Sequence, residues 1–285
     1  MISPLLWAMC NHIDKIILER YFKEGGVGTL IIVSALASVI ATPFLCMIDP
    51  SVLDVGMGSF GIIVITAALD IVLLWAYLNA MQRDDSSRVI VYYQLVPIFG
   101  IVAGWIFLGE VISKDQFVAM AVVILGTSIV SLENVEGRFR FKGRTVGYML
   151  LACACWAAEL AIFKVVALEE NPWRSLFWNH IVLMVLGVLM YLFIPRYRAS
   201  FQAAMQTNSV PLLSANLLSE VLYMLAVVSY SLAAMLAPVA LVLLTVTFQS
   251  IFVFLIAILI ARFIPKLATE SADRTHVALK GAAIC

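Results

Sequence analysis

Residues 92–133 read YYQLVPIFGIVAGWIFLGEVISKDQFVAMAVVILGTSIVSLE, two apolar runs separated by a short polar hinge. The first run ends at Leu108-Gly109-Glu110, the hinge spans 111–115, and the second run lasts to Val130. Each run is close to ~20 residues, enough for a helix to cross about 30 Å of hydrocarbon. Lipid offers backbone groups no outside hydrogen-bond partner, so a crossing segment is helical. The stretch therefore predicts a hairpin of two membrane helices.

The whole chain shares this apolar character. Of its 285 residues, 63% are hydrophobic and 13% are charged, with a mean hydropathy of +1.03. Soluble domains carry about 25% charged residues, so we predict an all-α polytopic membrane protein with the lipid bilayer as its main partner. Lys plus Arg and Asp plus Glu are equal at 18 each, which leaves no basic field for a nucleic acid.

Apolar runs and their polar breaks predict nine complete membrane helices. Their ranges are 3–21, 27–48, 57–82, 87–109, 115–132, 145–168, 173–194, 210–236 and 238–262. A tenth run begins near His276 and stops at Cys285, about 15 Å of helix, so we expect the tenth helix to be cut short.

The proline-containing helix that ends in Phe-Leu-Gly-Glu at 107–110, followed by a glycine-punctuated helix, resembles the fourth and fifth helices of an EamA repeat. EamA proteins form a family of the drug/metabolite transporter superfamily. The resemblance implies two five-helix repeats, 1–134 and 145–285, joined by a linker at 135–144 and forming a ten-helix basket around a central cavity. It also implies export of small organic metabolites such as amino acids across a bacterial cytoplasmic (inner) membrane, by a monomer or homodimer.

The second half departs from the family motif. Residues 261–266 read ARFIPK where Phe-Leu-Gly-Glu would recur, and the acid follows only at Glu270. A role carried over from Glu110 to Glu270 is therefore not expected to hold without change.

Five pairs of matching residues recur in the two halves at a slowly growing separation. They are Trp7 and Trp156, Lys15 and Lys164, Asp70 and Glu220, Tyr77 and Tyr230, and Glu110 and Glu270, at separations that grow from 149 to 160. Duplication followed by small loop insertions would produce such a drift. Because each half holds an odd number of helices, the second half enters the membrane from the opposite side. This inverted repeat predicts a binding site at the interface between the halves.

Loop charge and family resemblance disagree about orientation. Thirteen basic residues follow odd-numbered predicted helices, whereas only Lys114 and Arg174 follow even-numbered ones. Short basic loops stay cytoplasmic, so charge predicts an amino terminus outside. The resemblance implies both termini inside. We favour the charge distribution.

Two acids lie near the middle of predicted spans, Asp70 in the third helix and Glu220 in the eighth. Ionisable groups at this depth cost a few kcal/mol and usually face a cavity or a partner. We interpret both as lining a central cavity, where they bind a cationic group or carry a proton. The alternative is that a neighbouring hydroxyl, amide or lysine satisfies each acid and that both serve packing.

The first helix carries a polar cluster of Asn11, His12, Asp14 and Lys15. Asn11 and Lys15 share a face with Asp14 beside them, so an internal Asp14–Lys15 pair would lower the cost of both charges. Alternatively, Lys15 extends to the membrane surface near the helix end, as does Lys164, and we favour this structural interpretation. His12 is a candidate proton carrier because its ordinary pKa is near neutral; otherwise it is a hydrogen-bonded packing residue.

Glu159 and Trp156 lie one turn apart on the sixth predicted helix and share a face. Glu159 points about 140° away from Lys164, so we expect it to reach another helix or the cavity. An aromatic ring beside a carboxylate suits a cationic or amphipathic substrate. Trp156 is otherwise a packing or interfacial aromatic residue.

Glu110 ends the fourth helix, where we expect a structural role in accepting hydrogen bonds from the start of the following helix. Gln94 and Gln249 lie inside the fourth and ninth helices, as interhelical hydrogen-bonding groups or as substrate contacts. Pro97 is expected to bend or start its helix.

Nothing in the sequence indicates an enzyme, a cofactor or a metal site. Gly-x-Ser-x-Gly, His-Glu-x-x-His and phosphate-loop motifs are absent, and the five cysteines lack metal-type spacing. The favoured interpretation is a secondary transporter of small organic metabolites, with alternating access between inverted repeats and coupling to protons through Asp70, Glu159 or Glu220. The alternatives are a non-transporting scaffold or subunit, and a lipid or amphiphile flippase or intramembrane enzyme with a lateral groove leading to the acids.

Overall fold

The computed structural model describes residues 1–21, 26–84, 86–133 and 142–263. Every regular element in these ranges is helical. The α-helices are α1 (Ile2–Tyr21), α2 (Gly26–Ala37), α3 (Ala41–Ile48), α4 (Met57–Met81), α5 (Ser86–Val91), α6 (Val96–Leu108), α7 (Lys114–Glu133), α8 (Gly143–Glu169), α9 (Pro172–Phe193), α10 (Pro195–Leu236), α11 (Val239–Val246) and α12 (Gln249–Phe263). The short 3-10 helices are η1 (Ser38–Ile40), η2 (Pro50–Leu53) and η3 (Tyr92–Leu95). The predicted all-α class is confirmed.

Seven helical segments in the described ranges are long and apolar enough to cross a membrane. They are Gly26–Ile48, Met57–Met81, Arg88–Leu108, Gly143–Glu169, Pro172–Phe193, Ser209–Leu236 and Val239–Ile260. These match seven of the nine predicted spans, and the chain is an integral multi-pass membrane protein. Helices α1 and α7 occupy the other two predicted spans but are not among the seven; α1 carries Asp14, Lys15 and Glu19, and α7 begins with Lys114 and Asp115. The predicted tenth helix and Glu270 lie outside the described residues.

Helix α10 is much longer than expected. It spans 42 residues from Pro195 to Leu236, whereas the sequence predicted a span of 210–236 after a loop. The added segment contains three Ala, two Arg and two Gln, which favour helix. Pro195 occupies its first turn, where the missing N–H costs nothing. The predicted loop at 195–209 is therefore wrong, because polarity alone does not interrupt a helix.

The hairpin at the end of α6 has the geometry that its sequence requires. Gly109 has φ +65°, a left-handed conformation that glycine adopts without strain. Its N–H bonds to the Trp105 carbonyl oxygen, and the Glu110 N–H bonds to that of Gly104. Pro97 lies in the first turn of α6, directly after η3, so it starts a helix segment as predicted.

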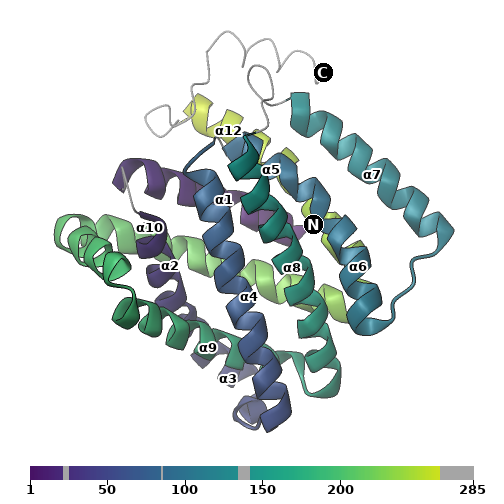
Figure 1. Cartoon of the computed structure of the whole chain (residues 1–285), viewed down its shortest axis with the longest axis horizontal. Coiled ribbons are helices and arrows are strands. Elements are labelled where there is room, and N and C mark those ends of the chain that lie inside the picture. Colours follow the sequence, from purple (N-terminus) through teal and green to yellow (C-terminus); the bar gives the residue numbers. More distant parts are fainter. Residues whose placement is uncertain (22–25, 85, 134–141, 264–285) are drawn as a thin grey trace.

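Helices from the two halves of the chain pack against each other throughout the bundle. Helix α1 packs on α10, α4 on α8, α2 on both α9 and α10, and α6 on α8 and α11. Figure 1 shows α4 and α8 running through the middle, with α7 at one edge beside α6. Phe117, Val118, Val122 and Leu125 of α7 are exposed, as a lipid-facing helix requires. The core therefore forms between the halves.

Candidate functional site

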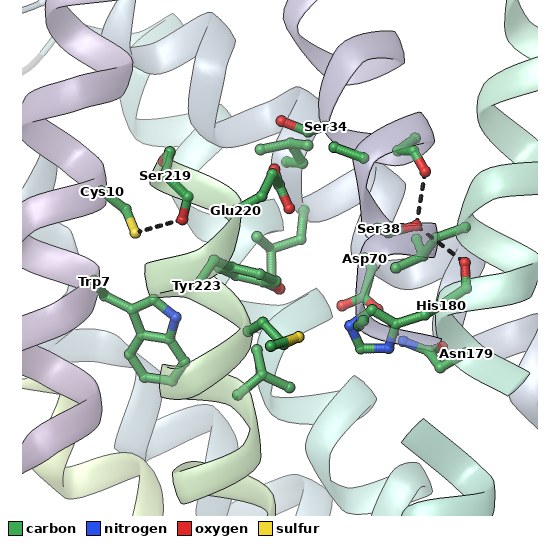
Figure 2. Close-up of a pocket in the computed structure, with 18 of the residues that line it drawn as sticks. Trp7, Cys10, Ser34, Ser38, Asp70, Asn179, His180, Ser219, Glu220 and Tyr223 are labelled. Carbon is green, nitrogen blue, oxygen red and sulfur yellow. Dashed lines mark hydrogen bonds between the residues drawn. The ribbon is translucent and has the colours of Figure 1, made fainter. Parts of the chain in front are cut away.

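A cavity of about 460 Å³ lies between the two halves of the chain. Residues of α1, α2, α4, α8, α9 and α10 line it, and Figure 2 shows ten of them by name. Its volume is typical of a small-molecule pocket.

Four carboxyl groups line this cavity, one from each of four helices. Asp14 comes from α1, Asp70 from α4, Glu159 from α8 and Glu220 from α10. Asp70 and Glu159 are close enough to interact electrostatically, as are Asp14 and Glu220. The acids thus form two pairs, which we call the Asp70–Glu159 pair and the Asp14–Glu220 pair. The sequence predicted Asp70 and Glu220 in a cavity, and the structure brings both there.

Asp70 lies in a hydrogen-bonded chain between α4 and α9. The Asn179 side-chain amide donates to the Asp70 carboxylate at 2.9 Å, and the Thr66 hydroxyl donates to the Asn179 amide oxygen at 3.1 Å. Thr66 lies one turn before Asp70, so helical spacing places both on the α9 side. In this arrangement one carboxylate oxygen of Asp70 is hydrogen-bonded to the Asn179 amide.

Glu220 lies in a similar arrangement between α10 and α2. The Asn216 amide donates to the Ser34 hydroxyl oxygen at 3.0 Å, and the Ser34 hydroxyl lies near the Glu220 carboxyl group. Asn216 lies one turn before Glu220, as Thr66 does before Asp70. Figure 2 shows Glu220 and Asp70 entering the same space from different helices, with Tyr223 beside them.

Asp14 accepts a hydrogen bond from the Ser219 hydroxyl at 3.3 Å, which links α1 to α10. The predicted alternative of an Asp14–Lys15 pair is not formed. Instead, the Lys15 ammonium donates to the Met81 and Asp84 carbonyl oxygens, both at 3.2 Å, and pairs with Glu19 at 3.0 Å. Lys15 is buried, so its predicted extension to the membrane surface is wrong. The carbonyls at the end of α4 supply the partners that water would have supplied.

Lys164 is also buried rather than extended to the surface. Its ammonium donates to Glu110 and to the Ala237 carbonyl oxygen, each at 2.7 Å. The other Glu110 oxygen accepts the Val239 N–H at 2.8 Å. Glu110 therefore caps the start of α11, on the other half of the chain, and not the following helix as predicted. Glu110 thus has the structural role that was predicted, but its partner lies far away in the sequence.

Aromatic rings form the part of the cavity wall nearest α1 and α8. Trp7 packs edge-to-face on Trp156 and on Tyr230, both with ring centroids 5.0 Å apart. Trp156 also packs edge-to-face on Tyr93 at 5.1 Å. All four residues line the cavity. Trp156 thus has both the packing role and the cavity position that the sequence left open.

Two predicted site residues do not line the cavity. The His12 Nε2 atom lies 2.9 Å from the Val253 carbonyl oxygen, on the side of α1 that faces α12. Gln94 donates to the Thr247 carbonyl oxygen at 3.1 Å and accepts from Thr127 at 2.6 Å. Gln249, in contrast, lines the cavity. Helical phase explains the difference for His12, because Asn11 and Asp14 face the cavity and residue 12 is turned away.

Ser219, Tyr223 and Tyr93 are among the cavity residues that the sequence analysis missed. Ser219 and Tyr223 adjoin Glu220 on α10, one residue before it and three after. Helical spacing from Glu220 would have identified Tyr223. Tyr93 follows no such rule, because η3 changes the helical phase before α6.

A polar cluster outside the spans joins the two halves at one end of the bundle. Asp49 accepts hydrogen bonds from the Ser51 hydroxyl and backbone and from the Asn171 amide. Bonds from Ser51, first from its side chain, lower the pKa of Asp49. Glu170 accepts from the Ser59 hydroxyl at 2.8 Å and pairs with Arg174. The pKa of Glu170 is lowered by Ser59 first and then by Arg174.

Three comparisons relate this chain to known proteins. A solved structure described as "Crystal structure of protein" is similar with a TM-score of 0.45 and 16% identity, covering 91% of this chain and 98% of that chain. No curated protein sequence matches. The profile described as "EamA-like transporter family" matches residues 1–132. Residues 1–132 of this chain thus match the EamA family of the drug/metabolite transporter superfamily, which confirms the resemblance drawn from the sequence for these residues.

Proposed function

We propose that this protein is a secondary transporter of small organic molecules in the bacterial cytoplasmic membrane. The observation that carries the proposal is the cavity itself, which holds four carboxyl groups between the two halves of an otherwise apolar bundle. Buried acids are costly in a membrane protein and mark substrate or ion pathways. Alternating access would expose the cavity to each side of the membrane in turn by rocking one half against the other.

The packing of the helices supports an inverted repeat. Exchanging α1 with α8, α2 with α9, α4 with α10, and α5–α6 with α11–α12 converts each major interface into another that is present. Thus α1 on α10 becomes α8 on α4, α2 on α10 becomes α9 on α4, and α6 on α8 becomes α12 on α1. The interface of α2 with α9 maps onto itself, and that of α6 with α11 becomes that of α12 with α5, which is also present. This is the pattern expected for a two-fold relation.

Individual side chains support the same relation. Lys15 donates to the Asp84 carbonyl oxygen just past the end of α4, and Lys164 donates to that of Ala237 just past the end of α10. The matched residues Trp7 and Trp156 contact each other, as residues near a two-fold axis would. The tenth helix remains a prediction.

The cavity favours transport over a non-transporting scaffold. A scaffold that merely retained the fold would be expected to have a centre filled with Leu, Ile and Phe. Here the centre holds Asp14, Asp70, Glu159 and Glu220 together with Asn179 and His180. A group of acids without such a role would be costly to keep in a membrane.

The test is flux in reconstituted vesicles. Purified protein is first screened for thermal stabilisation by amino acids, amines and nucleosides, because a ligand that binds the folded state raises its stability. Flux of the stabilising compounds is then measured with and without a pH gradient. Asp70→Asn, Glu159→Gln and Glu220→Gln should each reduce flux, while Glu169→Gln, an exposed acid at the end of the same helix as Glu159, should not. A triple variant with unchanged flux refutes the assigned roles.

A further inference from the structure

The charges around the cavity are of one sign. Four carboxyl groups line it, and none of its lining residues in the described ranges is a lysine or arginine. The two buried lysines on the same helices as Asp14 and Glu159 face elsewhere. Lys15 bonds to the end of α4 and to Glu19, and Lys164 bonds to Glu110 and Ala237. Positive charge in the cavity must therefore come from outside the lining.

The acids also interact electrostatically in two pairs across the cavity. Two carboxylates in one buried site repel each other, and both can ionise only when a cation lies near them. The Asp70–Glu159 pair belongs to α4 and α8, and the Asp14–Glu220 pair to α1 and α10. Each pair thus forms a separate place where a positive group would be stabilised.

Unpartnered polar atoms give a second indication that the cavity takes a ligand. Trp7 and Asn11 are each 5% exposed and Gln249 is 1% exposed, and all three line the cavity. The Trp7 Nε1, Asn11 Nδ2 and Gln249 Oε1 atoms have no hydrogen-bond partner among the described residues. Figure 2 shows the indole nitrogen of Trp7 on the side of its ring nearer Tyr223. Leaving such groups unsatisfied costs free energy, which a ligand with polar atoms would recover.

The aromatic wall fits the same ligand class. Trp7, Trp156, Tyr93 and Tyr230 contact one another edge-to-face or tilted and line the cavity with the acids. Ring faces attract ammonium groups, and quaternary ammonium groups are commonly bound by aromatic residues. A cation that carries methyl groups would be stabilised both by the aromatic rings and by the carboxylates.

We propose that the cavity selects an organic cation, a protonated amine or quaternary ammonium compound, over zwitterionic amino acids. This rests on the proposed transport function and adds the charge class of the substrate. The cation lies between the aromatic wall and one carboxyl pair, and the free donors of Trp7 and Asn11 bind a neutral oxygen of the ligand. A carboxylate in that position would lie near Asp14, which is one turn from Asn11 on the same face of α1. Like charges so placed are unfavourable.

The experiment compares three ligands of similar shape. Choline is a cation, glycine betaine replaces its alcohol with a carboxylate, and 3,3-dimethyl-1-butanol replaces its nitrogen with carbon. Binding to the purified full chain in nanodiscs is measured by calorimetry, with ethanolamine against glycine as a second pair. We expect the cation to bind about tenfold more tightly than its zwitterionic partner, and the neutral analogue to bind weakly.

Variants link this preference to the carboxyl pairs. Glu159→Gln and Glu220→Gln each remove one acid from a different pair and should reduce the preference for choline, while Glu169→Gln should retain it. Two variants in separate pairs keep the test valid if one fails to fold. Equal or tighter binding of betaine and glycine overturns the inference, as does binding of none of the cations.

Flux measurements separate this inference from the proposed function. Choline and glycine betaine are each offered to vesicles containing the protein. Transport of glycine betaine without binding of choline would overturn the charge class and leave transport in place. Tight binding of choline without flux of any compound would uphold the charge class and refute transport.

Discussion

The buried pair of Glu110 and Lys164 should be the most sensitive polar contact between the two halves. Replacing Glu110 by Gln keeps the side-chain shape and an acceptor for the Val239 N–H. It removes the charge that lies 2.7 Å from the Lys164 ammonium. Lys164 then keeps the Ala237 carbonyl oxygen but no acid.

The magnitude follows from burial. The side chains of Lys164 and Glu110 are 10% and 16% exposed, so water screens neither charge appreciably. Removing one partner of a buried ion pair costs about 3–5 kcal/mol, because the remaining charge stays buried without compensation. Replacing both charges removes that penalty, so Glu110→Gln combined with Lys164→Met should be more stable than Glu110→Gln alone by about 2 kcal/mol or more.

The assay is thermal or SDS-induced unfolding in detergent micelles, followed by tryptophan fluorescence. The matched control is Glu19→Gln, which removes the partly exposed acid paired with Lys15. The Lys15 ammonium keeps two carbonyl acceptors, so the loss of stability should be smaller than for Glu110→Gln. A Glu110→Gln variant as stable as the Glu19→Gln control would refute the reasoning. So would a double variant less stable than the single one.

Three further predictions concern packing, pH and orientation. Gly100→Ala should lower stability by about 1–3 kcal/mol in the same assay, because the added Cβ would lie 2.5 Å from a Leu243 side-chain atom. A Cβ added at Gly126 would have nothing within 4 Å, so Gly126→Ala should raise stability by up to about 1 kcal/mol. Equal effects of the two substitutions would contradict this prediction. The folded-state pKa of Glu170 is lowered, so its stabilisation is present at neutral pH and is lost as the pH falls through that lowered pKa. Glu170→Gln should therefore be less stable than wild type at pH 7, and the difference should shrink as the pH is lowered. A difference in stability that is independent of pH would exclude this linkage. If loop charge sets the orientation, Ser113→Cys in a cysteine-free background should react with a membrane-impermeant thiol reagent added outside the cell. Ala199→Cys should react only after the membrane is permeabilised. The reverse labelling pattern would support the orientation that the family resemblance implies.

The sequence was sufficient for the helices themselves. Apolar length decides which segments can cross a membrane, since this depends only on local composition. The position of Asp70 and Glu220 inside such segments likewise indicated an internal polar site, because no lipid-facing position tolerates an acid cheaply. The Phe-Leu-Gly-Glu segment and the helices around it were enough to suggest a resemblance to the EamA family.

Only the tertiary structure decided which polar groups meet. Lys164 and Glu110 are 54 positions apart and pair because α6 and α8 pack together, a fact that no local spacing contains. His12 and Asp14 are two residues apart, yet only Asp14 reaches the cavity, because the rotation of α1 is set by the helices around it. Local composition determines which segments can cross a membrane, whereas the partner of each side chain depends on contacts between helices distant in sequence.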